Sequence, residues 1–121
     1  MQNNGIKIIF FGTADFAAPV LETLVREGYE VVAAITQPDK PTGRRQISTS
    51  PPIKIAAQKL SLPILQPNSL KDSNFLNSLK PITHNLKPDL GVVVAYGKII
   101  PPEIFNLPKH GTLNIHPSLL P

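Results

Sequence analysis

The sequence predicts an α/β protein built on a doubly wound, mostly parallel β-sheet. Short apolar runs rich in β-branched and aromatic residues alternate with segments whose apolar residues recur at helical spacing. Strands that alternate with helices in this way form parallel pairs joined by crossover helices. The chain has 121 residues, of which 41% are hydrophobic, and this is enough to bury one core. We therefore expect one α/β unit.

The chain opens with a predicted strand-helix-strand unit. Residues 6–11 form an apolar run that Gly12 ends, and residues 29–36 form a second strand. Between them, Asp15 is a suitable N-cap and Gly28 a suitable stop for a helix. Apolar side chains recur at helical spacing within that helix, at Phe16, Val20, Leu21, Leu24 and Val25.

Residues 37–51 interrupt this alternation. They are polar and basic, rich in Pro, Gly, Ser and Thr, and show no hydrophobic period, so we predict a mobile loop. Pro52 then begins a short predicted helix that ends at Leu60, since proline is tolerated in a first turn. The remaining predicted elements are strands at 62–65, 90–95 and 111–116 and helices at 73–80 and 101–108. The continuous apolar run at 90–95 indicates a strand buried on both faces.

Doubly wound sheets bind ligands beyond the carboxyl ends of their strands, where the strand order reverses. Three segments should reach that edge: residues 12–16, residues 96–101 and whatever follows His116. A dinucleotide site is disfavoured there, because Ala14 and Ala17 stand where the glycine-rich motif has its second and third glycines.

Composition excludes several function classes. The chain has no cysteine, and its histidines (His84, His110 and His116) lie far apart in sequence, so we expect neither disulfides nor a metal site. No apolar run approaches the ~20 residues that span a bilayer, and the first residues do not resemble a signal peptide. We therefore expect a cytoplasmic protein without a membrane partner.

Basic residues are concentrated in one stretch. The net charge is +4, and residues 40–59 contain no acidic residue. The basic residues of that stretch are Lys40, Arg44, Arg45, Lys54 and Lys59. Such a stretch can neutralise phosphates of a nucleic acid, although a charged run is more often an ordinary solvated surface.

Asn114 and His116 are the candidate catalytic pair. Residues two apart on a strand share a face, with Cα atoms roughly 6 to 7 Å apart. Pro117 favours an extended backbone at His116. An amide donor and an imidazole directed at one point suit a reaction that passes through an oxyanion and moves a proton. The same spacing also fits an ordinary strand end with a structural histidine.

Four motifs together resemble the methionyl-tRNA formyltransferase family, namely IIFFGTADFAAPVL, TQPDKPTGR, VVVAYGKIIP and LNIHPSLLP, in this order. The resemblance covers nearly the whole chain. It implies a Rossmann-like formyltransferase fold and transfer of a formyl group from 10-formyltetrahydrofolate to the amino group of methionine on initiator tRNA. The implied cosubstrate is thus 10-formyltetrahydrofolate, the implied partner is initiator methionyl-tRNA, and no metal is implied.

The resemblance also implies residue roles. Asn114 would hydrogen-bond the formyl oxygen, and His116 would assist the tetrahedral intermediate and proton movement. The implied folate-binding residues are Val94, Tyr96, Gly97, Ser118, Leu119, Leu120 and Pro121. The implied tRNA-binding residues are Lys40, Gly43, Arg44 and Arg45.

Members of this family have a downstream aspartate that pairs with the histidine, further strands and a C-terminal tRNA-binding domain. Residues 1–121 are therefore expected to be the N-terminal part of the catalytic domain, with a sheet truncated on its C-terminal side, and to be inactive alone. Glycinamide ribonucleotide and aminosugar-nucleotide formyltransferases share the NIHPSLLP end and are alternatives. The GTADFA turn lacks the Gly/Ser/Asn-rich character that the glycinamide enzyme uses for its substrate phosphate. A non-catalytic, truncated module is a third alternative.

Overall fold

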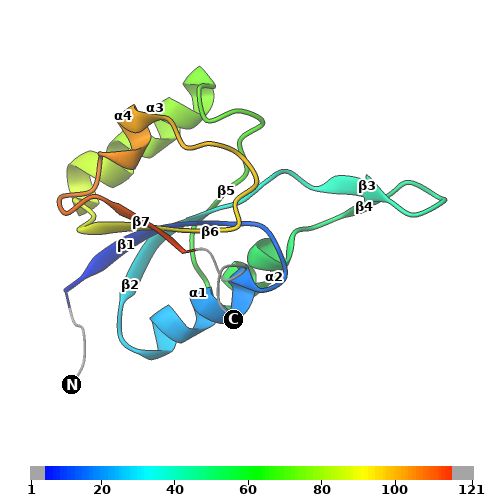
Figure 1. The fold of residues 1–121 in the computed structure, drawn as a ribbon, viewed down its shortest axis with the longest axis horizontal. Helices are drawn as coiled ribbons and strands as arrows, with labels where there is room; N and C mark the ends of the chain where they lie inside the picture. Colours follow the sequence, from blue (N-terminus) through cyan, green and yellow to red (C-terminus); the bar gives the residue numbers. More distant parts are fainter. Residues whose placement is uncertain (1–4, 116–121) are drawn as a thin grey trace.

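The apolar runs of the sequence form the interior strands of a parallel sheet (Figure 1). The computed structural model describes residues 5–115, apart from the side chain of Thr42. In chain order the elements are β1 (Lys7–Gly12), α1 (Ala17–Arg26), β2 (Glu30–Ile35), β3 (Lys40–Thr42), β4 (Ile47–Thr49), α2 (Pro52–Lys59), β5 (Ile64–Leu65), α3 (Ser73–Pro81), the π-helical turn η1 (Ile82–Leu86), β6 (Leu90–Val94), α4 (Pro102–Phe105) and β7 (Thr112–Ile115). The sheet has the order β5-β2-β1-β6-β7 with parallel neighbours throughout, which confirms the predicted fold class.

Helices cover both faces of this sheet. Ile8 and Phe10 of β1 pack in one apolar cluster with α1 and α2, whereas Ile9 and Phe11 pack in a second cluster with α3 and α4. This division follows from the alternation of side chains along a strand. Figure 1 shows the same arrangement, with α1 and α2 on one side of the sheet and α3 and α4 on the other. Full burial of each such side chain is worth about 1.5–3 kcal/mol, so the two clusters supply the main stabilisation of the fold.

The strand order reverses next to β1. The chain moves from β1 to β2 and β5 on one side, and then returns to β6 and β7 on the other. At the carboxyl end of this central pair, Gly12 of β1 lies opposite Val94 of β6. The loops that follow these two strands therefore meet at one edge of the sheet, as the sequence predicts. Within residues 5–115, no helix has the length and apolar character needed to cross a membrane.

Helix α1 begins later than the sequence predicts. Its N-cap is Phe16 rather than Asp15, and no side chain caps it. The backbone N–H groups of Thr13 and Ala14 donate instead to the carbonyl of Ala95, at 3.2 and 3.4 Å. These bonds hold the turn after β1 against the loop after β6, outside the helix. The prediction of Asp15 as the N-cap was wrong because the neighbouring strand, rather than local capping, decides where the helix begins.

The predicted loop at residues 37–51 contains a β-hairpin. Strands β3 and β4 pair antiparallel, with Lys40 opposite Thr49 and Thr42 opposite Ile47. Figure 1 shows this hairpin projecting away from the five-stranded sheet. Ile47 is 61% exposed, and all three residues of β4 are exposed, so this strand has no buried apolar face. The prediction of a loop throughout this segment was wrong, because the hairpin lacks the buried face that would produce a hydrophobic period.

Candidate active site

The turn after β6 is held from two sides. The carbonyl of Tyr96 accepts a hydrogen bond of 2.8 Å from Thr13 Oγ1 and one of 3.1 Å from Gln37 Nε2. Ala95 has a φ of +48° and Gly97 a φ of +97°. Left-handed backbone is uncommon for a residue other than glycine, so the bonds from neighbouring strands stabilise a turn that the local sequence does not favour.

A cavity of about 270 Å³ opens at this turn. Its lining residues are Thr13, Ala14, Gln37, Lys40, Ala95, Tyr96, Gly97 and Lys98. A second cavity of about 180 Å³ adjoins it, because both are lined by Thr13, Gln37 and Lys40. The second cavity extends to Ser50 and Pro52, where the chain leaves the hairpin. The two cavities together form a hollow that runs from the β6 turn to the base of the hairpin. It occupies the strand-order reversal, where sheets of this kind bind ligands.

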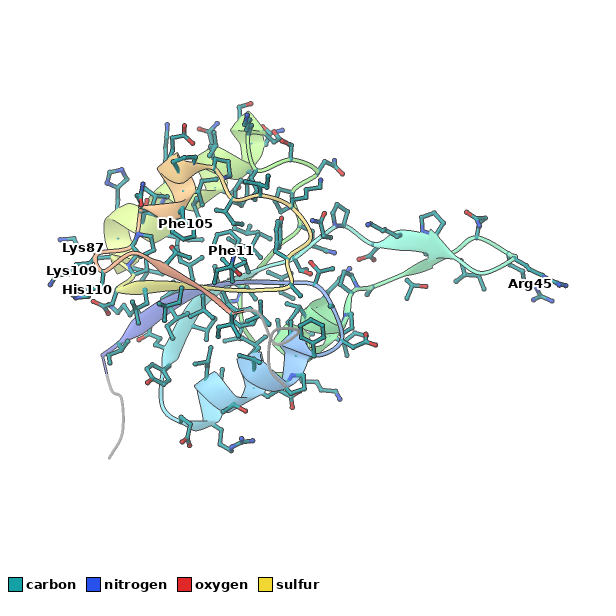
Figure 2. All side chains as sticks on the ribbon, in the orientation of Figure 1. Phe11, Arg45, Lys87, Phe105, Lys109 and His110 are labelled. Carbon is teal, nitrogen blue, oxygen red and sulfur yellow. The ribbon has the colours of Figure 1, made fainter. Side chains whose placement is uncertain are left out.

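The predicted folate-binding residues within the described chain have different environments. Gly97 is exposed in the turn, whereas the side chains of Val94 and Tyr96 are 0% and 2% exposed. The ring of Tyr96 packs edge-to-face on Phe11, with ring centroids 5.8 Å apart (Phe11 is labelled in Figure 2). Burial raises the pKa of the Tyr96 phenol to about 12, so the phenol stays protonated at neutral pH. Val94 belongs to the core and can act on the site only through its backbone.

Asn114 lies on the edge strand β7, opposite Val93 and one position before the last residue of the strand. It shares the face of Val93, which packs in the cluster that contains Ile104 of α4. Its side chain is exposed and therefore available to a ligand. The other predicted residues near this end of the chain, His116, Ser118, Leu119, Leu120 and Pro121, lie outside the described residues.

The predicted basic residues lie at both ends of the hairpin. Lys40 is at the base and lines the hollow, whereas Arg44 and Arg45 occupy the turn at the tip. Figure 2 shows Arg45 at the far end of the hairpin. The turn is closed by Gln46, whose backbone N–H and Nε2 both donate to the carbonyl of Gly43, at 3.2 and 2.9 Å. The three basic residues, Lys40, Arg44 and Arg45, are thus spread along an extended arm rather than gathered in one compact cluster.

Two residues that line the hollow, Thr13 and Gln37, were not among the predicted site residues. Thr13 directly follows β1, whereas Gln37 comes two residues after the end of β2 and is only 4% exposed. Polar residues at the carboxyl ends of neighbouring parallel strands would have indicated them. In the described part of the chain, no group of three or more His, Asp or Glu side chains could hold a metal ion.

The fold and this hollow define an α/β protein with a doubly wound sheet and a cavity at the strand-order reversal. The sequence matches the formyl transferase family over residues 6–121, and the chain belongs to that family.

Individual relatives carry a more specific name. The chain is 51% identical to a methionyl-tRNA formyltransferase of Alkaliphilus oremlandii and 48% identical to one of Pelotomaculum thermopropionicum, in each case over 116 residues. Each match covers 96% of this chain but 36% of the relative, so the chain spans about a third of the length of these relatives. A crystal structure of phosphoribosylglycinamide formyltransferase from Bacillus halodurans is similar in fold. Its TM-score is 0.62 at 16% identity, covering 95% of this chain and 58% of the other.

Proposed function

We propose that the protein to which this chain belongs transfers a formyl group from 10-formyltetrahydrofolate to the amino group of initiator methionyl-tRNA. The observation that carries this proposal is the similarity to named methionyl-tRNA formyltransferases, at 51% and 48% identity over 96% of the chain. Residues 1–121 would then be the N-terminal part of the catalytic domain, and the relatives' greater length leaves room for further domains.

The reaction needs stabilisation of one negative charge and transfer of one proton. The amino nitrogen forms a bond to the formyl carbon, and the formyl oxygen becomes an oxyanion. The bond from this carbon to the folate nitrogen then breaks, that nitrogen takes up a proton, and the amine loses one. In this proposal the amide of Asn114 donates to the oxyanion and His116 carries the proton. The exposure of Asn114 near the carboxyl end of β7 supports its role.

The hollow at the strand-order reversal is the proposed folate site. Tyr96 and Gly97 line it, and Val94 supports the turn from the core. A volume of about 270 Å³ suits a ring system better than a whole folate. Residues 118–121 are proposed to complete the folate contacts.

The hairpin is the proposed tRNA contact. Lys40 at the hollow and Arg44 and Arg45 at the tip would neutralise phosphates along the acceptor end, with Gly43 shaping the turn. The exposure of residues 43–49 supports such a contact, because the arm offers its charges freely to a large partner.

A turnover assay of the full-length protein with both substrates tests the proposal. We expect Asn114→Ala to lower kcat by about 10²–10³, the effect of losing one oxyanion donor. We expect His116→Ala to lower kcat by about 10²–10⁴, the effect of losing a general acid or base. Asn77→Ala, an exposed amide on α3, is the matched control and should keep full turnover. Formyl transfer to glycinamide ribonucleotide but not to methionyl-tRNA would contradict the substrate. Turnover of Asn114→Ala within a few-fold of wild type would contradict the residue roles.

A further inference from the structure

Asp39 joins the two ends of the basic hairpin. It directly precedes β3, and Ser50 directly follows β4. Ser50 Oγ donates a hydrogen bond of 3.1 Å to Asp39 Oδ2. One carboxylate therefore connects both segments through which the hairpin leaves the body of the domain.

The same carboxylate is bound to the body of the domain. Lys54 of α2 places Nζ 3.1 Å from Oδ2 and 3.3 Å from Oδ1 of Asp39. Gln66, which follows β5, donates from Nε2 to Oδ1 at 2.8 Å and to the carbonyl of Gln37 at 3.2 Å. We call these four residues, Asp39, Ser50, Lys54 and Gln66, the Asp39 cluster. It links the hairpin to a helix on one face of the sheet and to an edge strand.

The Asp39 cluster is partly shielded from water. The side chains of Lys54 and Asp39 are 24% and 31% exposed. The pKa of the Asp39 carboxyl lies below its ordinary value. The main cause is the hydrogen bond from Gln66, and the next is the hydrogen bond from Lys54. The carboxylate is thus ionised at neutral pH and accepts from three donors at once. A carboxylate that accepts from several donors holds its neighbours in place more firmly than a single ion pair on the surface does.

The hairpin is not part of the five-stranded sheet. Strands β3 and β4 form a separate two-stranded sheet, and Figure 1 shows them extending away from the body of the domain. A two-stranded hairpin alone is marginally stable in water. Any change of direction at its base displaces the tip most, because the tip lies farthest from the attachment.

We infer that Asp39 is a positioning residue that fixes the direction of the hairpin, and so places Arg44 and Arg45 relative to the hollow lined by Lys40. The inference rests on the proposed function, since it concerns binding of the anionic tRNA substrate. A hairpin with a fixed direction binds without the ordering cost that a swinging arm would add. Asp39 touches neither substrate in this account and acts through the hairpin.

Amide hydrogen exchange of the full-length protein tests the positioning without any substrate. We expect Asp39→Ala to speed exchange across residues 40–49 by about tenfold, because local opening becomes easier, while β1 and α1 stay protected. Glu22→Gln, which removes an exposed carboxylate on α1, is the control and should leave the hairpin unchanged. Unchanged exchange in Asp39→Ala would overturn the inference whatever the protein's substrate is.

Steady-state kinetics separates positioning from a merely structural effect. We expect Asp39→Ala to raise KM for methionyl-tRNA at least about fivefold through the added ordering cost of two arginines. The KM for 10-formyltetrahydrofolate should stay within twofold, and kcat should change little. A fall in kcat with both KM values unchanged would mean that less of the protein is folded, and would also overturn the inference.

Two further variants sharpen this test. Asp39→Asn keeps an oxygen acceptor and should recover part of the lost tRNA affinity. Lys54→Met should raise KM for tRNA, whereas Lys59→Met on the same helix should not. If Lys54→Met and Lys59→Met raised KM equally, the change would reflect general charge and the Asp39 cluster would have no special role. Exchange results that match the expectation in a protein without formyl transfer to tRNA would retain the positioning and reject the proposed function.

Discussion

Thr13 and Tyr96, 83 residues apart in sequence, are joined by a hydrogen bond of 2.8 Å from Thr13 Oγ1 to the Tyr96 carbonyl. This bond connects the segment after β1 with the segment after β6, at the reversal of strand order. The same carbonyl accepts from Gln37 after β2. The segments after β1 and β2 thus fix one backbone oxygen, and with it the left-handed turn at Ala95 that shapes the hollow.

Replacing Thr13 should loosen this turn. We expect Thr13→Val to lower the free energy of unfolding by about 1 kcal/mol, the net worth of one neutral hydrogen bond. The KM for the folate substrate should rise as the wall of the hollow moves. Thr13→Ser keeps the hydroxyl and is the matched variant. Denaturant unfolding and steady-state kinetics of the full-length protein provide the measurements, and identical behaviour of Val and Ser variants would exclude the hydrogen bond as the cause.

The arginines at the hairpin tip should determine how binding depends on salt. Each phosphate contact that is lost lowers the slope of log K against log salt by about 1. We expect Arg44→Ala and Arg45→Ala each to reduce this slope for tRNA, with kcat at saturating tRNA nearly unchanged. Arg26→Ala on α1 serves as a control of equal charge. Filter binding over a range of salt concentrations measures the slope, and a slope equal to that of wild type would rule out phosphate contacts at the tip.

Gly91 on β6 has no room for a side chain. A Cβ atom there would collide with Oγ1 of Thr112 and lie 2.9 Å from its Cγ2. Thr112 cannot turn away freely, because Oγ1 donates to the carbonyl of Phe105 at 2.6 Å. We expect Gly91→Ala to destabilise the fold by about 1–3 kcal/mol, as overpacking does.

A double mutant separates this clash from other effects of the added methyl group. Thr112→Ala removes the two nearest atoms, so the double variant with Gly91→Ala should be less destabilised than the sum of the single changes. Thermal unfolding of the four proteins measures the coupling. Strict additivity would mean that Thr112 does not cause the effect.

The buried phenol of Tyr96 should make stability fall at alkaline pH. Its pKa is about 12 in the folded protein against 10.0 for an ordinary tyrosine, because burial disfavours the phenolate. Since the folded-state pKa is the higher one, the contribution is complete below pH 10 and is lost as pH rises from 10 towards 12. Tyr96→Phe should lose less stability than wild type over this range in thermal unfolding. Equal losses of stability in Tyr96→Phe and wild type over this range would rule out the buried phenol as the cause.

The interior of the fold could be predicted from the sequence, because burial on both faces leaves continuous apolar runs such as Ile8 to Phe11 and Val92 to Val94. The order of helices and strands then indicated the edge at which the loops meet. The start of α1 could not be predicted, because the amides of Thr13 and Ala14 bind the carbonyl of Ala95, a partner about 80 residues away. Local capping preferences contain no information about such a partner.

The site was only partly predictable for the same reason. Motifs predicted site roles for Tyr96, Gly97 and the basic hairpin residues. Gln37 and Asp39 lie in the motif TQPDKPTGR, but the motif does not indicate which distant groups their side chains bind. The partner of Asp39 on the far side, Gln66, is 27 residues away, and the ion pair with Lys54 spans 15. Polar contacts at these separations depend on how β5 and α2 pack, which composition and spacing do not specify.

The hairpin is inserted in the connection between β2 and α2, and its two strands form their own small sheet. Neither apolar cluster includes a residue of β3 or β4 among its members. Mutations in residues 43–46 can therefore accumulate without disturbing the packing of the sheet or the hollow at its edge. Under the proposed function, changes at the hairpin tip could alter which acceptor is favoured while the hollow at the sheet edge is kept, provided that the attachment at the hairpin base is retained.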